Sequence, residues 1–157
     1  MKAIPLAALA ALLMLAGGAF AEDDAAPVSP AFDEALARSV GADDNGMRQY
    51  VLVILKTGPT PVPAGEARSE MFRGHFANMK RLAAEGKLAL AGPLDGVDGW
   101  RGLFILAVTD LEEAAALVAT DPVIINGEMV AEYHKYYGSA ALMLVNDAHA
   151  KVARKGF

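Results

Sequence analysis

The hydrophobic residues of the chain fall into four short runs and two longer periodic segments. Residues 50–55 and 103–108 are apolar throughout, a pattern typical of strands that are buried on both faces. Residues 87–93 form a shorter run, and residues 129–137 alternate in character, as expected for a strand with two different faces. These four segments are predicted to be the β-strands of the protein.

Two amphipathic segments separate the strands. Residues 66–85 place apolar side chains three and four positions apart, which predicts a helix that ends at Gly86. Residues 109–112 form a capping-box pattern that opens a second helix, and this helix stops before Pro122. The order β-α-β-β-α-β predicts an α+β fold, in which a four-stranded antiparallel sheet carries both helices on one face.

Further helices are expected on either side of this core. Ser29 and Pro30 predict the start of a short helix over residues 32–40. Its apolar residues recur at every fourth position from Phe32, so this helix is expected to dock on the main domain. Residues 140–153 predict a last helix that is appended to the sheet.

The second face of the predicted sheet has no helix to cover it. Two of the four strands are apolar on both faces, so this uncovered face is expected to be hydrophobic. The pattern therefore predicts a homodimer, in which two sheets pack face to face and close into a barrel. In the alternative, the N-terminal and C-terminal segments cover this face in a monomer.

The first residues have the three regions of a secretory signal peptide in order. Lys2 precedes an apolar run over residues 3–15, and Ala19-Phe20-Ala21 is a small-x-small cleavage pattern. The apolar run is shorter than the roughly 20 residues needed to cross a bilayer. We expect a signal peptide over residues 1–21, a leader and short helix over 22–47, and one domain with a C-terminal helical extension over 48–157. The mature protein is then periplasmic or secreted, without a membrane anchor.

Composition removes several classes of site. The 157 residues include no cysteine, which excludes disulfides, thiolate metal sites and thiol nucleophiles. Nineteen acidic residues against 14 basic ones give a net charge of −5, which argues against a nucleic-acid partner. The basic residues Lys151, Arg154 and Lys155 lie at the end of the predicted last helix, where cations complement the helix dipole.

A histidine and an aspartate are the strongest candidates for chemistry. His75 lies on the apolar stripe of the first helix, so it is either a hydrogen-bonded core residue or a site residue. Gly74 beside it costs about 1 kcal/mol relative to alanine in a helix, which indicates a close approach to the backbone. Asp121 follows the second helix, where the dipole disfavours an anion. A histidine within hydrogen-bond reach of an aspartate would form a general base and its orienting carboxylate.

The remaining candidates have weaker signals. His134 lies on the alternating strand and is expected to be exposed or paired with a neighbouring glutamate, and His149 lies on the last helix. The three histidines lack the short spacings of metal ligands, so no metal site and no cofactor are predicted. Ser139 does not occupy the G-x-S-x-G motif of a nucleophile elbow.

One combination of these residues resembles the YCII-related family. The pattern H-x(6)-L-x(3)-G-x-L-x(2)-A-G-P runs from His75 to Pro93, and Asp121-Pro122 follows the second helix. The similarity covers about residues 50–137, and residues 137–142 resemble an exported branch of the family. The resemblance implies a dimeric ferredoxin-like α+β barrel and a His–Asp dyad at His75 and Asp121, in a cleft under the sheet. One relative in this family is a dehydrochlorinase that acts on a chlorinated hydroxyquinol.

The resemblance leads to two hypotheses for function. In the first, the protein is a cofactor-free lyase or isomerase, and neutral His75 removes a proton next to a carbonyl of a small organic acid or phenol. Arg101, Tyr137 and Ser139 would bind the developing oxyanion, and His149 could enter the substrate site. In the second, the protein is a non-catalytic module of the cell envelope that binds a small molecule or has a structural role. A partner-binding protein that uses the Pro-rich loop over residues 59–65 or the edge of the fourth strand is a third hypothesis.

Overall fold

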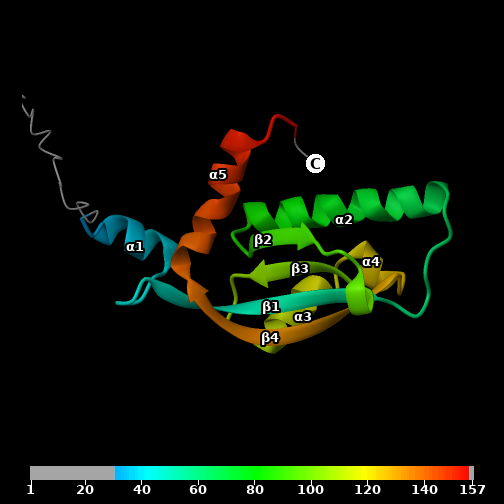
Figure 1. Ribbon diagram of the computed structural model, residues 1–157, viewed down its shortest axis with the longest axis horizontal. Coiled ribbons are helices and arrows are strands. Elements are labelled where there is room, and N and C mark those ends of the chain that lie inside the picture. The colour runs from blue at the N-terminus through cyan, green and yellow to red at the C-terminus, as the bar shows by residue number, and fades with distance from the viewer. Residues whose placement is uncertain (1–30, 156–157) are drawn as a thin grey trace, which may run out of the picture. The chain divides into compact units, whose positions relative to one another are not determined.

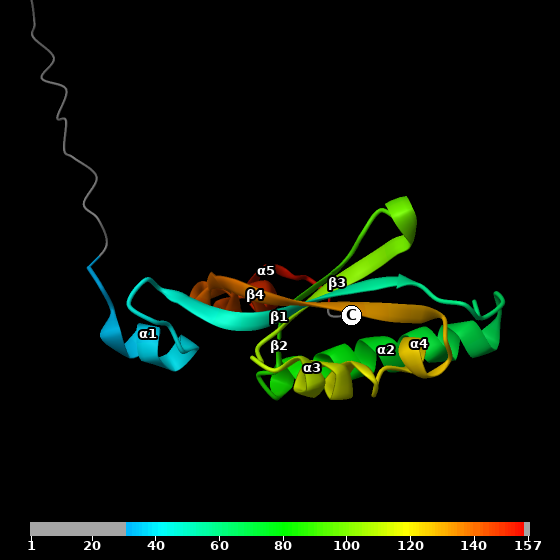
Figure 2. The ribbon, with the colours of Figure 1, turned by 90° about the horizontal axis from the view of Figure 1, so that it is seen from below.

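The computed structural model describes residues 31–155. Its antiparallel sheet has the strand order β2-β3-β1-β4, so β1 and β3 are central and β2 and β4 are edges (Figure 1). The strands are β1 (Met47–Thr57), β2 (Leu88–Pro93), β3 (Trp100–Leu106) and β4 (Met129–Ser139). Helices α2 (Glu66–Ala84) and α3 (Leu111–Val118) cover one face of the sheet (Figure 2). The predicted ferredoxin-like α+β fold is confirmed.

Shorter elements connect and flank this core. The predicted N-terminal and C-terminal helices are present as α1 (Glu34–Val40) and α5 (Val145–Val152). A one-turn helix, α4 (Pro122–Ile125), lies between α3 and β4, where an irregular connection was expected. Two 3₁₀ segments, η1 (Val97–Gly99) and η2 (Ala140–Leu144), precede β3 and α5.

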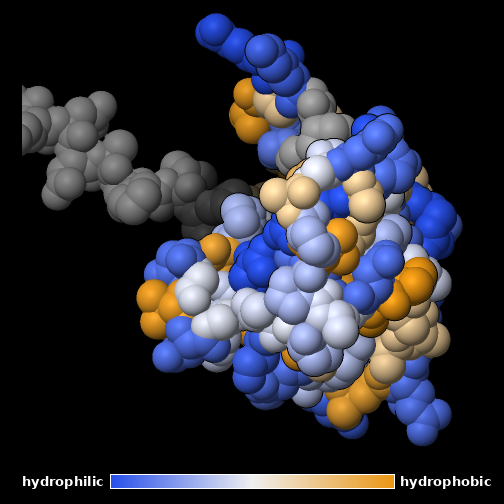
Figure 3. All heavy atoms as spheres, turned by 90° about the vertical axis from the view of Figure 1, so that its right-hand side faces the viewer, coloured by the Kyte–Doolittle hydropathy of each residue, from blue (hydrophilic) through white to orange (hydrophobic). Residues whose placement is uncertain are grey.

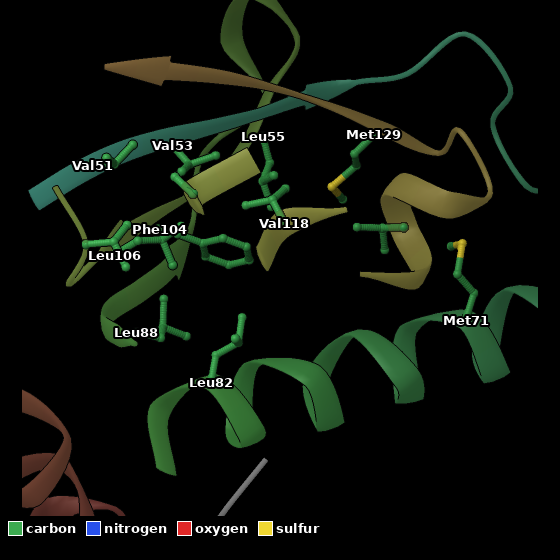
Figure 4. Packing of buried hydrophobic residues seen from close by; sticks show 13 residues of the cluster. Val51, Val53, Leu55, Met71, Leu82, Leu88, Phe104, Leu106, Val118 and Met129 are labelled. Carbon is green, nitrogen blue, oxygen red and sulfur yellow. The ribbon is translucent and has the colours of Figure 1, made fainter. Parts of the chain in front are cut away.

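The main core lies between the sheet and the helices (Figure 4). Alternate residues of β1 and β3 point toward α2 and α3, which contribute Leu82 and Val118 to the same cluster. Leu82 and Val118 are fully buried, and burial of such a side chain stabilises the fold by roughly 1.5–3 kcal/mol. The sheet residues of this cluster include Val51, Val53, Leu55, Phe104 and Leu106.

A second, smaller cluster lies on the other face of the sheet. Tyr50 and Ile105 are buried there, and Leu142 and Met143 of η2 pack against them. The continuous apolar runs of β1 and β3 are therefore explained by cover on both faces. The C-terminal segment covers part of this face within a single chain, while Val130 on β4 stays 43% exposed.

The two flanking helices differ in detail from the prediction. Asp33 caps α1 by accepting a hydrogen bond from the Leu36 amide at 2.9 Å, whereas the predicted start at Ser29 lies outside the described residues. Phe32 is 81% exposed and Leu36 is 43% exposed, so the expected docking face is wrong apart from Val40, which is buried. Helix α5 begins at Val145 and not at residue 140, because the chain first forms the 3₁₀ turn η2.

The described residues contain no helix with the length and apolar content needed to cross a membrane. Hydrophilic and hydrophobic side chains are mixed on the side of the molecule where α2 begins (Figure 3). The predicted signal peptide over residues 1–21 lies outside the described part of the chain.

Candidate active site

Helix α2 and the start of α4 bring His75 and Asp121 together. The His75 Nδ1 atom lies 2.8 Å from Oδ2 and 3.0 Å from Oδ1 of Asp121. Both residues are buried, with 8% and 0% of their surface exposed. An ionised carboxylate can only accept hydrogen bonds, so Nδ1 carries the proton in this contact. When the ring with this tautomer is neutral, the free lone pair lies on Nε2.

The structure explains why Asp121 follows α3 directly. Asp121 is the N-cap of α4, and its Oδ1 atom accepts a hydrogen bond from the Val123 amide at 3.1 Å. Pro122 occupies the first turn of α4, where its missing N–H costs nothing. Asp121, whose charge is unfavourable after the C-terminus of α3, is therefore favourably placed as the N-cap of α4.

Gly74 permits the close approach that was predicted for it. A Cβ atom at this position would lie 2.9 Å from Cγ of Pro122, closer than carbon atoms pack. Because Gly74 adjoins His75 and Pro122 adjoins Asp121, this contact sets how near the two functional residues can come. The glycine therefore has a packing role that offsets its low helix propensity.

His75 also forms one wall of a cavity of about 440 Å³ between α2 and the sheet, to which all four strands contribute lining residues. Aromatic rings surround the imidazole: the centroid of Phe76 lies 5.4 Å away, and those of Phe72 and Phe104 each lie 6.1 Å away. Arg101 also lines this cavity, and its Nη1 atom lies 3.5 Å from Oε1 of Glu128. The cavity thus combines a largely apolar wall with one buried basic group and one cation, the composition expected of a small-molecule site.

Glu128 is a charged residue of this region that the sequence analysis did not single out. It is 1% exposed, and its Oε1 atom lies 2.7 Å from Nη2 of Arg68 and 3.5 Å from Nη1 of Arg101. Its Oε2 atom accepts a hydrogen bond from the Val62 amide at 2.7 Å. The Arg68 hydrogen bond, the Val62 amide and the charges of both arginines outweigh burial and lower the pKa of Glu128. This carboxylate therefore joins the Pro-rich loop to the arginine that lines the cavity.

The sequence of the chain is similar to that of a known protein family. The model of the YCII-related domain matches residues 49–134, which is more than half of the chain. The chain belongs to the YCII-related family. The uncharacterized protein YjpA of Bacillus subtilis (strain 168) is 34% identical over 81 residues, which are 52% of this chain and 85% of that protein.

Among solved structures, the chain is similar to 5-chloro-2-hydroxyhydroquinone dehydrochlorinase from Burkholderia phenoliruptrix AC1100, in complex with 2,5-dihydroxybenzoquinone. It is 19% identical, with a TM-score of 0.40, and the match covers 55% of this chain and 92% of that one. The ferredoxin-like fold of the present YCII-related protein follows from its own strand order. The matched family region ends at residue 134, so η2 and α5 lie beyond it.

Two of the predicted substrate-binding residues of this YCII-related protein lie away from His75. Tyr137 donates a hydrogen bond to the Asp43 carboxylate, which raises the pKa of the phenol and lowers that of the acid. The Ser139 hydroxyl accepts from the Ala141 amide at 3.3 Å and so caps η2. Both residues lie at the C-terminal end of β4, whereas Met129, at the N-terminal end of the same strand, is the β4 residue that lines the cavity. The structure therefore does not bring Tyr137 or Ser139 to the dyad.

The other two histidines also have defined surroundings. His134 Nε2 lies 2.7 Å from Oε1 of Glu132, which confirms the expected pairing with a neighbouring glutamate. His149 lines a second hollow beside α5 and not the cavity of His75. Within residues 31–155, no group of three or more histidine, aspartate or glutamate side chains is placed to hold a metal ion.

Proposed function

We propose that this YCII-related protein is a cofactor-free lyase or isomerase that acts on a small organic acid or phenol. The observation that carries the proposal is the contact between His75 and Asp121 at the wall of a largely apolar cavity. Asp121 engages Nδ1, so the second nitrogen, Nε2, accepts a proton from a carbon next to a carbonyl. The carboxylate then stabilises the imidazolium that forms.

The proton transfer leaves negative charge on the substrate oxygen. Arg101 lines the same cavity and supplies a guanidinium that suits an enolate, phenolate or carboxylate oxygen. In an isomerisation the proton returns from Nε2 to a different carbon, and in an elimination a leaving group departs with the electron pair. In either case His75 is the base and Arg101 binds the anion.

The first experiment measures proton exchange and needs no known substrate. A panel of small keto acids and phenols is incubated with the protein in deuterium oxide, and loss of carbon-bound proton signals is followed by NMR. Exchange is expected with the wild-type protein and is expected to be lost in His75→Ala. Asp121→Asn keeps an oxygen for the Val123 amide and is expected to reduce the exchange. Unchanged exchange in both variants would refute the proposal.

A second candidate function is a non-catalytic small-molecule-binding module. It is favoured by the fact that the His75–Asp121 contact joins α2 to α4, so the pair also has a place in the fold. In this reading the cavity binds a ligand without turnover. Ligand binding without exchange, unaffected by Asp121→Asn, is the result expected for it.

We also propose that the protein is exported and forms a homodimer. The motive for export is the signal-peptide pattern over residues 1–21. The dimer is supported by the part of the second sheet face that η2 leaves uncovered. The apolar residues Leu52, Leu90 and Leu103 on this face are only partly buried. A processed N-terminus at Glu22 in a periplasmic or medium fraction tests the first. Light scattering of the wild-type protein and of Leu103→Glu tests the second, and a wild-type monomer would refute it.

A further inference from the structure

A second hollow lies beside the cavity of His75. Its volume is about 480 Å³, and its walls come from the C-terminal half of α2, the edge strand β2 and helix α5. Both hollows have the size of small-molecule sites, which are roughly 300–1,000 Å³. The lining of the second hollow is largely aliphatic and includes Met79, Ala83, Leu88, Leu90, Ala150 and Ala153.

The two hollows adjoin each other. Met79 and Ala91 line both of them, so the boundary between the hollows is made by these two side chains. Methionine is unbranched and changes its rotamer easily, and alanine is small. A change of the Met79 rotamer would therefore join the two hollows without a change in the backbone.

Helix α5 is fixed against the sheet edge. The Asn146 side-chain amide donates a hydrogen bond to the Leu88 carbonyl of β2 at 2.8 Å. This contact uses a polar group of the edge strand and holds the outer wall of the second hollow in place. Because the matched family region ends at residue 134, this wall belongs to the C-terminal extension of the present chain.

We propose that the two hollows form one elongated binding site. An anionic aromatic or carbonyl head lies against His75 and Arg101, and an apolar tail of the same molecule lies in the hollow beneath α5. The aliphatic lining of this hollow matches an alkyl or aryl tail, while its polar groups, Lys80, Asn146 and His149, are on exposed positions suited to a rim. This inference rests on the proposed function, because it specifies the substrate class of the same site.

The test uses 4-methylbenzoate, 4-butylbenzoate and 4-octylbenzoate as probes of the full-length chain. Isothermal titration calorimetry gives each affinity, and NMR of the His75 ring reports whether the head reaches the dyad. Each fully buried methylene tightens binding by about fourfold. Since the hollow is open on one side, we expect at least a tenfold gain from butyl to octyl, with the His75 signal shifted by all three probes.

Two substitutions on α5 provide a matched pair. Ala150→Phe fills the hollow from an exposed helix position and is expected to remove the gain from butyl to octyl, while 4-methylbenzoate binding is retained. Ala148→Phe makes the same change on the same helix at an exposed position that does not line the hollow. It is expected to leave the dependence on tail length unchanged.

The outcomes separate this inference from the proposed function. Equal affinities for the three probes, with a shifted His75 signal, would overturn the elongated site and leave the proposed function standing. A tail-length dependence without any His75 shift would show a separate site and would also overturn it. Failure of all three probes to bind would overturn the substrate class, and the proton-exchange assay would then judge the proposed function by itself.

Discussion

Substituting Gly74 by alanine tests how the fold positions the dyad. In a helix interior, alanine is favoured over glycine by about 1 kcal/mol, so propensity alone predicts a more stable protein. The added Cβ atom would, however, lie 2.9 Å from Cγ of Pro122, and the proline ring cannot turn away as a flexible side chain would. Overpacking of this kind costs roughly 1–3 kcal/mol. The expected result is a net loss of about 1 kcal/mol.

The same substitution is expected to disturb the dyad. Relief of the contact requires α2 and α4 to separate, and these helices carry His75 and Asp121, whose contact is only 2.8 Å long. The ¹⁵N shifts of the His75 ring report which nitrogen carries the proton. We expect Gly74→Ala to weaken the preference for a proton on Nδ1, and urea unfolding to give the loss of stability.

A double-mutant cycle with Pro122→Ala isolates the contact. Removing Cγ leaves the proline Cβ position as the nearest neighbour, at 3.6 Å from the added atom, which is ordinary van der Waals contact. In this background Gly74→Ala is expected to stabilise the protein by about 1 kcal/mol, so the two backgrounds differ by about 2 kcal/mol. Stabilisation of the wild-type background by Gly74→Ala would refute the reasoning.

Three further predictions concern the buried Glu128, the core residue Leu82 and the Asp43–Tyr137 pair. Glu128→Gln is expected to cost about 1–3 kcal/mol in urea unfolding. The pKa of Glu128 is lowered from its ordinary value of 4.5, so its contribution to the free energy of unfolding is complete above pH 4.5 and is lost as the pH falls through the lower folded pKa. The free energy of unfolding of the variant should therefore fall less steeply at acid pH than that of the wild-type protein. Leu82→Ala is expected to lower stability by about 2–5 kcal/mol in the same assay, and a loss below 1 kcal/mol would contradict its place in the core. Asp43→Asn is expected to return the pKa of the Tyr137 phenol toward 10.0 in an ultraviolet titration while proton exchange stays at the wild-type level.

The sheet was predictable because its pattern is local. Strands β1 and β3 are apolar at consecutive positions, and this follows directly from cover on both faces by the helices and by η2. The helix boundaries at the ends were less predictable. The helix α1 begins after Asp33 and α5 begins only at Val145, because side-chain caps and a 3₁₀ turn select the first residue.

The candidate site was predictable only in part. His75 and Asp121 were identified by residue type and by a family pattern, but they are 46 positions apart, and their contact accompanies the close packing of Gly74 on Pro122. Tyr137 was misplaced because it lies near the opposite end of β4 from Met129, which lines the cavity, and no local pattern shows which end of the strand meets the site.

Glu128 was missed for a different reason. It lies between Gly127 and the first residue of β4, where an acidic residue is usually solvated, and only the fold brings Arg68, Arg101 and the Val62 amide around it. A local sequence window contains none of these partners. Buried ion pairs between distant segments are therefore a class of site contact that a single sequence does not reveal.

The structure changes which measurement separates an enzyme from a binding module. A core histidine that is lost leaves its buried partner without a hydrogen bond, at a cost of about 1–3 kcal/mol, whereas a strained catalytic residue often costs little. Here His75→Ala removes a hydrogen bond from fully buried Asp121 under either hypothesis, although the Val123 amide still engages one of its oxygens. A loss of stability in this variant therefore fits both functions equally. Proton exchange still separates them, because it reports on Nε2 as a base, whereas the Nδ1 contact with Asp121 is the same under both hypotheses.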